Sequence, residues 1–142
     1  MLVMDTDTLS LLERANAEAL PLQIRLEPVP LDEIFTTVVT YEEQMRGWLA
    51  RAAQANTTEK LLVAYSRLIL HLETFRNLAV LPFDAEAAAQ FARLRKAGVR
   101  IGTMDLRIAS IALSHDALVI TRNLSDFSKV PGLRCEDWSV SL

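Results

Sequence analysis

The stretch LVMDTDTLSLL, residues 2–12, carries the pattern that decides the fold. The apolar run Leu2–Met4 ends at Asp5 and is followed by leucines at helical spacing, which predicts a strand, a turn and a helix. Asp7 is the residue expected to cap this helix, because an aspartate side chain accepts hydrogen bonds from the free N–H groups of a first turn. The segment therefore predicts the opening strand and helix of an α/β fold, with Asp5 where the strand ends.

The same alternation of strand and helix continues beyond this segment. Further runs that are apolar or rich in β-branched residues predict strands at residues 34–39, 78–81 and 117–120, and an edge strand at 133–138. Capping residues that precede apolar residues at helical intervals predict helices from about residues 40, 56, 84 and 103. Strands that alternate with helices form a mainly parallel sheet with helices on both faces.

Each of these helices has a predicted cap, and Asp84 is the one expected for the helix at residue 84. Thr40 and Glu43 have the spacing of a capping box, and Asn56 and Glu59 repeat it. Thr103 is expected to cap the helix that carries Asp105 in its first turn. The apolar face of the helix at residues 56–77 is expected to lie in the core, with a protein-binding surface as the alternative.

Length and composition restrict the class of protein. The chain has 142 residues, 51% of them hydrophobic, so residues 1–142 are expected to form a single domain. A net charge of −3 excludes a strongly basic nucleic-acid coat, so any RNA contact must use local basic surface. One cysteine, Cys135, allows no intrachain disulfide, and no secretory signal or bilayer-length apolar run is visible. We expect a soluble, cytoplasmic protein with no membrane association.

Four carboxylates fall where such folds bind ligands, beyond the carboxyl ends of the strands. They are Asp5 after the first strand, Glu43 after the second, Asp105 at a helix start and Asp126 after the strand that ends at residue 120. An oxygen-only cluster suits Mg²⁺, which Mn²⁺ can replace, and suits Zn²⁺ poorly. Asp5, Asp105 and Asp126 are the expected metal ligands, and Glu43 would bind a metal or orient the attacking water. The sequence thus predicts metal-dependent hydrolysis of a phosphodiester.

The chain resembles the PIN-domain family, specifically the VapC-type toxin ribonucleases of type II toxin–antitoxin systems. The matching segments are MDTDTL at 4–9, TYEE at 40–43 with Gly47, IGTMD at 101–105 and TRNLSDF at 121–127. The resemblance implies a PIN-like three-layer α/β sandwich and a Mg²⁺-dependent endoribonuclease that cleaves RNA, is inhibited by a cognate antitoxin and is often a homodimer.

The resemblance also assigns roles to single residues. The four acids Asp5, Glu43, Asp105 and Asp126 match the acidic residues of the family. Thr6 matches a hydroxyl that supports the first aspartate, and Asn123 stands where the family has asparagine or aspartate. Glu42 and Gln44 replace the small apolar residues that usually flank the family's glutamate, and the spacing to Gly47 favours Glu43 as the functional one.

Other interpretations of these residues remain open. Each acid alone is explained by helix capping or turn formation. Arg122 could contact RNA phosphate, or be an ordinary solvated arginine. One alternative function is a haloacid-dehalogenase-type phosphatase, with Asp5 as nucleophile and Asp7 as acid and base, although no lysine is suitably placed. Another is a non-catalytic PIN-like module that binds RNA or a protein.

Overall fold

A computed structural model describes residues 1–141, and its centre is a parallel sheet of five short strands. The strand order is β3-β2-β1-β4-β5. The strands are β1 (Leu2–Met4), β2 (Ile34–Thr37), β3 (Ala79–Leu81), β4 (Leu118–Ile120) and β5 (Arg134–Glu136). Leu2 pairs in parallel register with Ile34 on one side and with Leu118 on the other. The prediction of a mainly parallel sheet is confirmed, and β1 lies at its centre.

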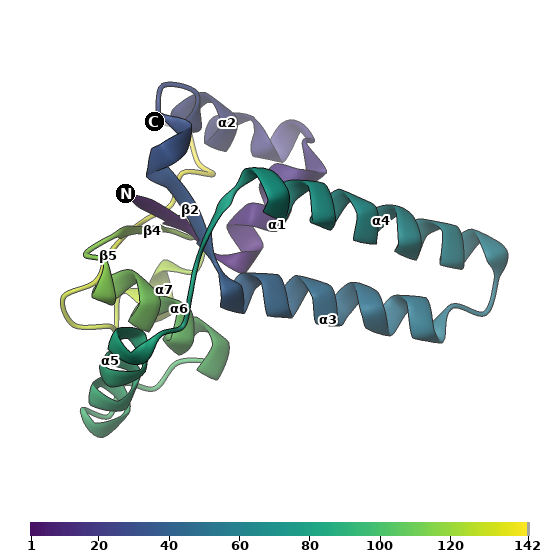
Figure 1. The fold of residues 1–142 in the computed structure, drawn as a ribbon. Coiled ribbons are helices and arrows are strands. Elements are labelled where there is room, and N and C mark those ends of the chain that lie inside the picture. The colour runs from purple at the N-terminus through teal and green to yellow at the C-terminus, as the bar shows by residue number, and fades with distance from the viewer. Residues whose placement is uncertain (142) are drawn as a thin grey trace.

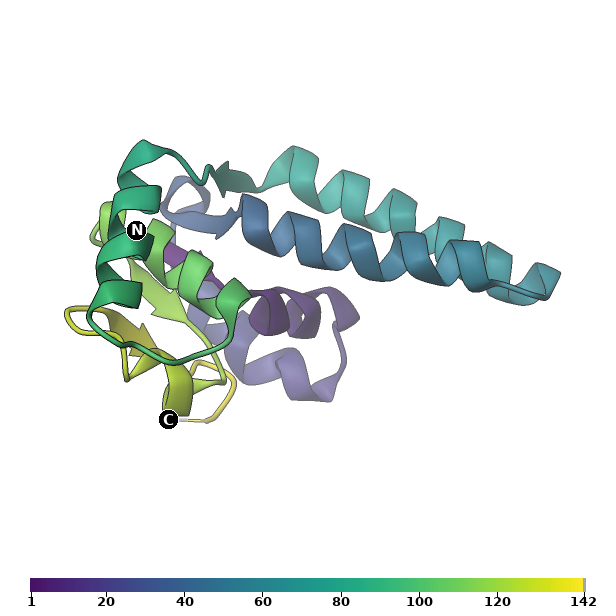
Figure 2. The same ribbon diagram turned by 90° about the horizontal axis from the view of Figure 1, so that it is seen from below.

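Helices cover both faces of this sheet, as the two ribbon views show (Figures 1 and 2). They are α1 (Thr6–Arg14), α2 (Leu20–Leu26), α3 (Val38–Gln54), α4 (Thr58–Asn77), α5 (Ala85–Lys96), α6 (Thr103–Ser114) and α7 (Leu124–Phe127), with short 3₁₀ turns at Ala17–Ala19 and Leu31–Glu33. Consecutive strand residues point to opposite faces. Val3 joins the apolar core under α5 and α6, whereas Met4 joins the core under α1 and α2. The predicted three-layer sandwich is therefore confirmed.

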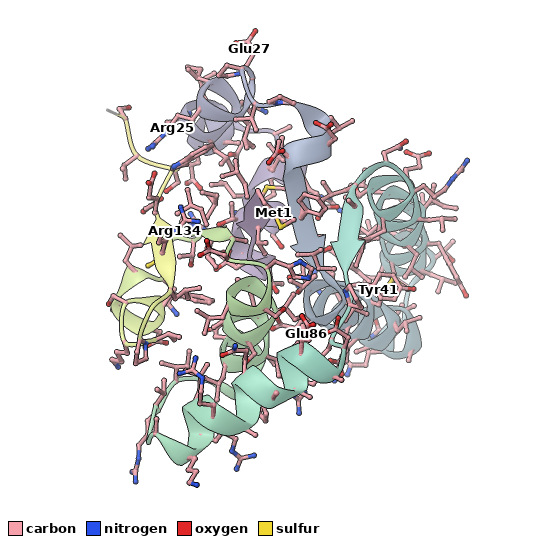
Figure 3. The ribbon with its side chains drawn as sticks, turned by 60° about the vertical axis from the view of Figure 1, so that its left-hand side comes forward. Met1, Arg25, Glu27, Tyr41, Glu86 and Arg134 are labelled. Atoms are coloured by element: carbon pink, nitrogen blue, oxygen red, sulfur yellow. The ribbon has the colours of Figure 1, made fainter. Side chains whose placement is uncertain are left out.

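Helices α3 and α4 form an antiparallel pair that extends beyond the sheet as a long arm (Figure 1). An edge-to-face contact between Tyr41 and Phe75, with ring centroids 5.0 Å apart, joins the two helices at the base of the arm, where Figure 3 labels Tyr41. Further out, Leu62 is 68% exposed and Leu72 is 57% exposed. The prediction that the apolar face of α4 lies in the core is wrong for Tyr65 and Leu72, because the arm reaches past the sheet, and correct for Phe75, which packs against the core under α1 and α2.

Four predicted helix caps are also wrong, whereas Asp84 caps α5 as its position suggested. Asp5, not Asp7, caps α1, and its side chain accepts from the backbone N–H of Thr8. Thr37 caps α3 by accepting from the N–H of Thr40, so the Thr40–Glu43 capping box does not form.

The other two starts shift by one residue. Thr57, rather than Asn56, caps α4, and α6 starts after Gly102 without a side-chain cap, so Thr103 is its first residue. In α1 and α3 the helix begins directly after a strand, so the last extended residue is the one that meets the free N–H groups.

Within residues 1–141, no helix has both the length and the apolar character needed to cross a bilayer.

Candidate active site

Asp5 is the most firmly held of the predicted acids. Its Oδ1 accepts from the backbone N–H of Thr8 at 2.9 Å, and its Oδ2 accepts from Thr121 Oγ1 at 2.6 Å. The residue is only 3% exposed. Burial raises the pKa of the Asp5 carboxyl, although the hydrogen bonds from Thr121 and Thr8 oppose this shift. The adjacent parallel strands β1 and β4 place this carboxylate and this hydroxyl side by side.

Glu43 lies on α3, in the turn after the residues that form its cap. Its Oε1 accepts from Thr6 Oγ1 at 2.6 Å, and Thr6 Oγ1 also lies 3.1 Å from Thr40 Oγ1. Thr6 therefore supports Glu43, and not Asp5 as the resemblance implied. Glu42 instead forms an ion pair with Arg46 along the outer side of α3. Glu43, and not Glu42, is therefore the glutamate that lies with the other acids, in keeping with its spacing to Gly47.

Asp105 and Asp126 are connected through Asn123. The Asn123 Nδ2 donates to Asp126 Oδ2 at 3.0 Å and lies 3.4 Å from Asp105 Oδ2. The same hydrogen bond from Asn123 and the nearby ammonium of Lys129 lower the pKa of Asp126. Asn123 thus holds two acids from different helices in fixed positions, as expected for a supporting residue.

The pKa of Asp105 shows that the four acids share one electrostatic environment. It is raised from 3.8 to about 6, first by burial and then by the negative charges of Asp5, Glu43 and Asp126. Hydrogen bonds connect the same region: Thr121 donates to Asp5 and accepts from the backbone N–H of Asn123, whose side-chain amide contacts Asp105 and Asp126. The structure therefore brings all four predicted acids to one end of the sheet.

This group has the chemistry of a divalent-cation site. Its donors are carboxylate oxygens, which Mg²⁺ and Mn²⁺ prefer, and their mutual repulsion is relieved by a bound cation. As placed in the described part of the chain, no three Asp, Glu, His or Cys side chains stand close enough together to hold an ion. Binding of a cation would therefore require the carboxylates to turn inward. These residues suit Mg²⁺ or Mn²⁺ because all of their ligand atoms are carboxylate oxygens.

Arg122 lies at the rim of the site and is engaged by Asp7. Its Nε and Nη2 donate to the two Asp7 carboxylate oxygens at 2.6 and 2.8 Å. These hydrogen bonds lower the pKa of Asp7 and raise that of Arg122. A carboxylate with a lowered pKa is a poor proton donor at neutral pH. The arrangement does not favour Asp7 as the acid and base of a phosphatase.

Thr121 is the residue of this site to which the sequence analysis assigned no role. It is fully buried directly after β4 and makes the shortest contact to Asp5. Its position after the apolar run LVI was a visible signal, because residues at the carboxyl ends of neighbouring parallel strands meet.

Comparisons with known proteins agree with this geometry. A sequence model of the PIN domain matches residues 2–133. The tRNA(fMet)-specific endonuclease VapC of Salmonella typhimurium is 34% identical over 84 residues, which cover 56% of this chain and 64% of that protein. Ribonuclease VapC5 of Mycobacterium tuberculosis is 35% identical over 105 residues, 71% of each chain. The match to the Salmonella protein thus spans somewhat less than two thirds of that relative's length.

Solved structures of VapBC proteins have the same fold as this chain. A DNA-bound VapBC structure from Salmonella typhimurium superposes with a TM-score of 0.77 and 26% identity, over 96% of this chain and 97% of that one. The VapBC-5 toxin–antitoxin structure from Mycobacterium tuberculosis has a TM-score of 0.60 and 32% identity, over 99% of this chain and 97% of that one.

Proposed function

Because the chain belongs to the PIN domain family, we propose that residues 1–142 form a single PIN domain that acts as a divalent-metal-dependent endoribonuclease, the toxin of a toxin–antitoxin pair. The observation that carries the proposal is the convergence of four carboxylates at one end of the sheet, where Asn123 contacts both Asp105 and Asp126 and repulsion among the acids adds to the raised pKa of Asp105. Such repulsion is costly unless a cation relieves it. The curated relatives named as VapC ribonucleases support RNA as the substrate.

Each side chain has a separate proposed role. Asp5, Asp105 and Asp126 would hold Mg²⁺, which supplies polarisation of the phosphodiester and a more acidic bound water. Glu43 would orient the attacking water or accept its proton, and the hydrogen bond from Thr6 fixes the carboxylate for this role. Thr121 and Asn123 keep the aspartates in place. Arg122 could reach an RNA phosphate only after it releases Asp7.

The test is cleavage of total and structured RNA with Mg²⁺, with Mn²⁺ and with chelator. We expect cleavage that needs the metal and falls by at least about 100-fold in Asp5→Asn and Asp105→Asn, since both remove a proposed ligand. Glu86→Gln is the matched control, because Glu86 is an exposed acid on α5 (Figure 3). Equal cleavage by all variants would refute the proposal, as would cleavage that survives chelation.

An antitoxin segment is the proposed occupant of an apolar groove on the other side of α1. The groove has a volume of about 520 Å³ and lies between α1, α2 and α4, where Leu9, Leu26 and Leu70 line it. The solved VapBC relatives are named as complexes of toxin and antitoxin, which supports this partner. An amphipathic segment would lay its apolar side chains into such a groove. Leu70→Glu should abolish co-purification with the cognate antitoxin, whereas retained co-purification would refute this location.

A second copy of the chain is the proposed partner for the exposed apolar face of α4. Leu62, Tyr65 and Ile69 are each more than half exposed there. A contiguous apolar face of this kind marks a protein interface more often than free surface. Light scattering should report a dimer for the wild type and a monomer for Ile69→Glu, and a monomeric wild type would contradict the proposal.

A further inference from the structure

A second pocket lies beyond the carboxylates, where α1, α3 and α4 meet. It has a volume of about 300 Å³, and its walls are formed by Ser10, Glu13, Arg14, Trp48, Arg67 and His71. None of these residues belongs to the carboxylate group, and the proposed chemistry uses none of them. The pocket therefore needs an explanation of its own.

The pocket lies on the same helix–helix seam as the active site. Helices α1 and α3 run side by side away from the sheet, and the contact of Thr6 with Glu43 marks the end nearest the carboxylates. Along the seam, Gln44 Nε2 donates to Ser10 Oγ at 3.2 Å and to Glu13 Oε1 at 2.9 Å. Trp48 is one turn further along α3 than Gln44. The pocket is thus the continuation of the seam, one to two helical turns from Glu43.

Two guanidinium groups in this pocket are free. Within residues 1–141, Arg14 and Arg67 form neither a hydrogen bond nor an ion pair, whereas Arg25, Arg46, Arg122 and Arg134 are all paired. The single acid of the pocket is already engaged, since Glu13 Oε2 accepts from Thr74 Oγ1 at 3.2 Å and Oε1 from Gln44. The pocket therefore offers positive charge and donors that no protein group uses.

Trp48 gives the pocket a flat aromatic wall. The Arg51 guanidinium lies 4.6 Å from the centre of its ring system and that of Arg67 lies 5.7 Å away. The longer contact is the weaker one, because cation–π attraction falls off near 6 Å. Arg67 is therefore the guanidinium that can turn toward a ligand and uncover the indole.

His71 supplies the observation that points to a ligand. The side chain is only 4% exposed, it lines the pocket, and neither ring nitrogen has a hydrogen-bond partner. Its Nδ1 lies 3.1 Å from Glu13 Oε2, but without the alignment of a hydrogen bond. Buried polar groups without partners are rare, because desolvation is not repaid. A polar ligand group in the pocket would satisfy this imidazole.

We propose that this pocket binds one nucleotide of a single-stranded RNA substrate, adjacent to the bond that the carboxylates cleave. Arg14 and Arg67 bind its phosphate, the base packs against Trp48, and His71 hydrogen-bonds the base edge or the ribose. Aromatic stacking combined with guanidinium contacts is the usual way in which proteins hold unpaired nucleotides. An acidic peptide would use the charges but not the flat wall. This inference rests on the proposed ribonuclease function.

The test measures RNA affinity separately from cleavage. Fluorescence anisotropy would follow a labelled 12-nucleotide single-stranded RNA with Mg²⁺ present, in an Asp5→Asn background that leaves the RNA intact. We expect Trp48→Leu to raise the Kd about tenfold and Trp48→Phe to restore most of the affinity, because a phenyl ring still stacks. Arg67→Gln should weaken binding and lower the salt dependence by about one counterion. Arg76→Gln, an exposed arginine on α4 outside the pocket, is the matched control.

A second measurement, tryptophan fluorescence, tests the proposal in a protein that keeps Trp48, so it does not depend on whether the Trp48 variants fold. With Trp138→Phe in the same background, Trp48 is the only tryptophan, so RNA should quench its fluorescence, while an oligomer of abasic nucleotides should not. Absence of quenching by intact RNA would overturn the proposal.

The possible outcomes distinguish failure of the pocket proposal from failure of the proposed ribonuclease function. If wild-type protein cleaves RNA but Trp48→Leu and Arg67→Gln bind it as tightly as Arg76→Gln, the pocket proposal fails alone. If these variants bind hexaglutamate peptide more weakly but bind RNA as tightly as before, the pocket binds an acidic protein segment, and the nucleotide proposal is refuted. If the wild type does not cleave RNA and the background does not bind it, both proposals fail together.

Discussion

Replacing Asp105 by asparagine should stabilise the protein when no divalent cation is present. The pKa of Asp105 is raised from 3.8 to about 6 in the folded state, first by burial and then by the other three carboxylates. A shift of about two pKa units corresponds to at most about 3 kcal/mol at neutral pH. Asp105 is partly exposed, so solvent screening reduces the expected gain to about 1–2 kcal/mol. For a chain of this length, that raises Tm by about 3–6 °C.

The sign of this effect depends on pH. Because the folded pKa is the higher one, the folded state holds the proton more tightly, and the ionised carboxylate destabilises the fold above pH 6. The penalty declines as the pH falls from 6 and is gone below the unfolded value of 3.8. The stabilising effect of Asp105→Asn should therefore be full at pH 7.5 and nearly absent at pH 4.

The assay is thermal unfolding followed by circular dichroism, in chelator, at these two pH values. Glu86→Gln, which removes an exposed acid from α5, should leave Tm unchanged at both. Addition of Mg²⁺ should stabilise the wild type more than Asp105→Asn, because only the wild type keeps the full carboxylate set. A lower Tm for Asp105→Asn at pH 7.5 in chelator would refute the reasoning, as would an equal gain at both pH values.

Three further predictions concern single side chains. Thr121→Val removes the hydrogen bond to buried Asp5, so the free energy of unfolding measured with urea should fall by about 1–3 kcal/mol, with RNA cleavage lowered as well; wild-type values would show that this bond is dispensable. Ala15→Gly should raise Tm by about 2 °C, because Ala15 ends α1 with φ of 50° and glycine adopts that conformation without strain; a lower Tm would contradict this. Thr37→Ala should cost about 1 kcal/mol in the same urea experiment and Thr103→Ala much less, since only Thr37 caps its helix, so equal costs would show that the assigned caps are wrong.

The strands and the four acids could be predicted because they depend on local sequence. Apolar runs of three or four residues mark β1 and β4, and an acid that follows such a run must lie at the edge where parallel strands end. The caps could not be predicted with the same success. Thr37 and Thr40 both have a suitable hydroxyl, and only the point at which β2 ends decides between them.

Features that depend on contacts between residues far apart in the chain could not be predicted from the sequence. The apolar pattern of α4 is the same for a core helix and for an interface helix, so it could not show that Leu62 and Leu72 are exposed. Thr6 was expected beside Asp5, its neighbour in the chain, but its hydroxyl turns to Glu43 on α3. The pocket around Trp48 and His71 is built from three helices, and no single segment carries its signature.

The most direct test of the carboxylate site is a calorimetric titration of Mn²⁺ into the metal-free protein at pH 7.5. We expect saturable binding by the wild type and by Glu86→Gln, with at least about tenfold weaker binding in Asp5→Asn and in Asp105→Asn, because each loses a charged oxygen ligand. Absence of Mn²⁺ binding by the folded wild type, or unchanged affinity in both aspartate variants, would contradict the proposal that these four acids form one divalent-cation site.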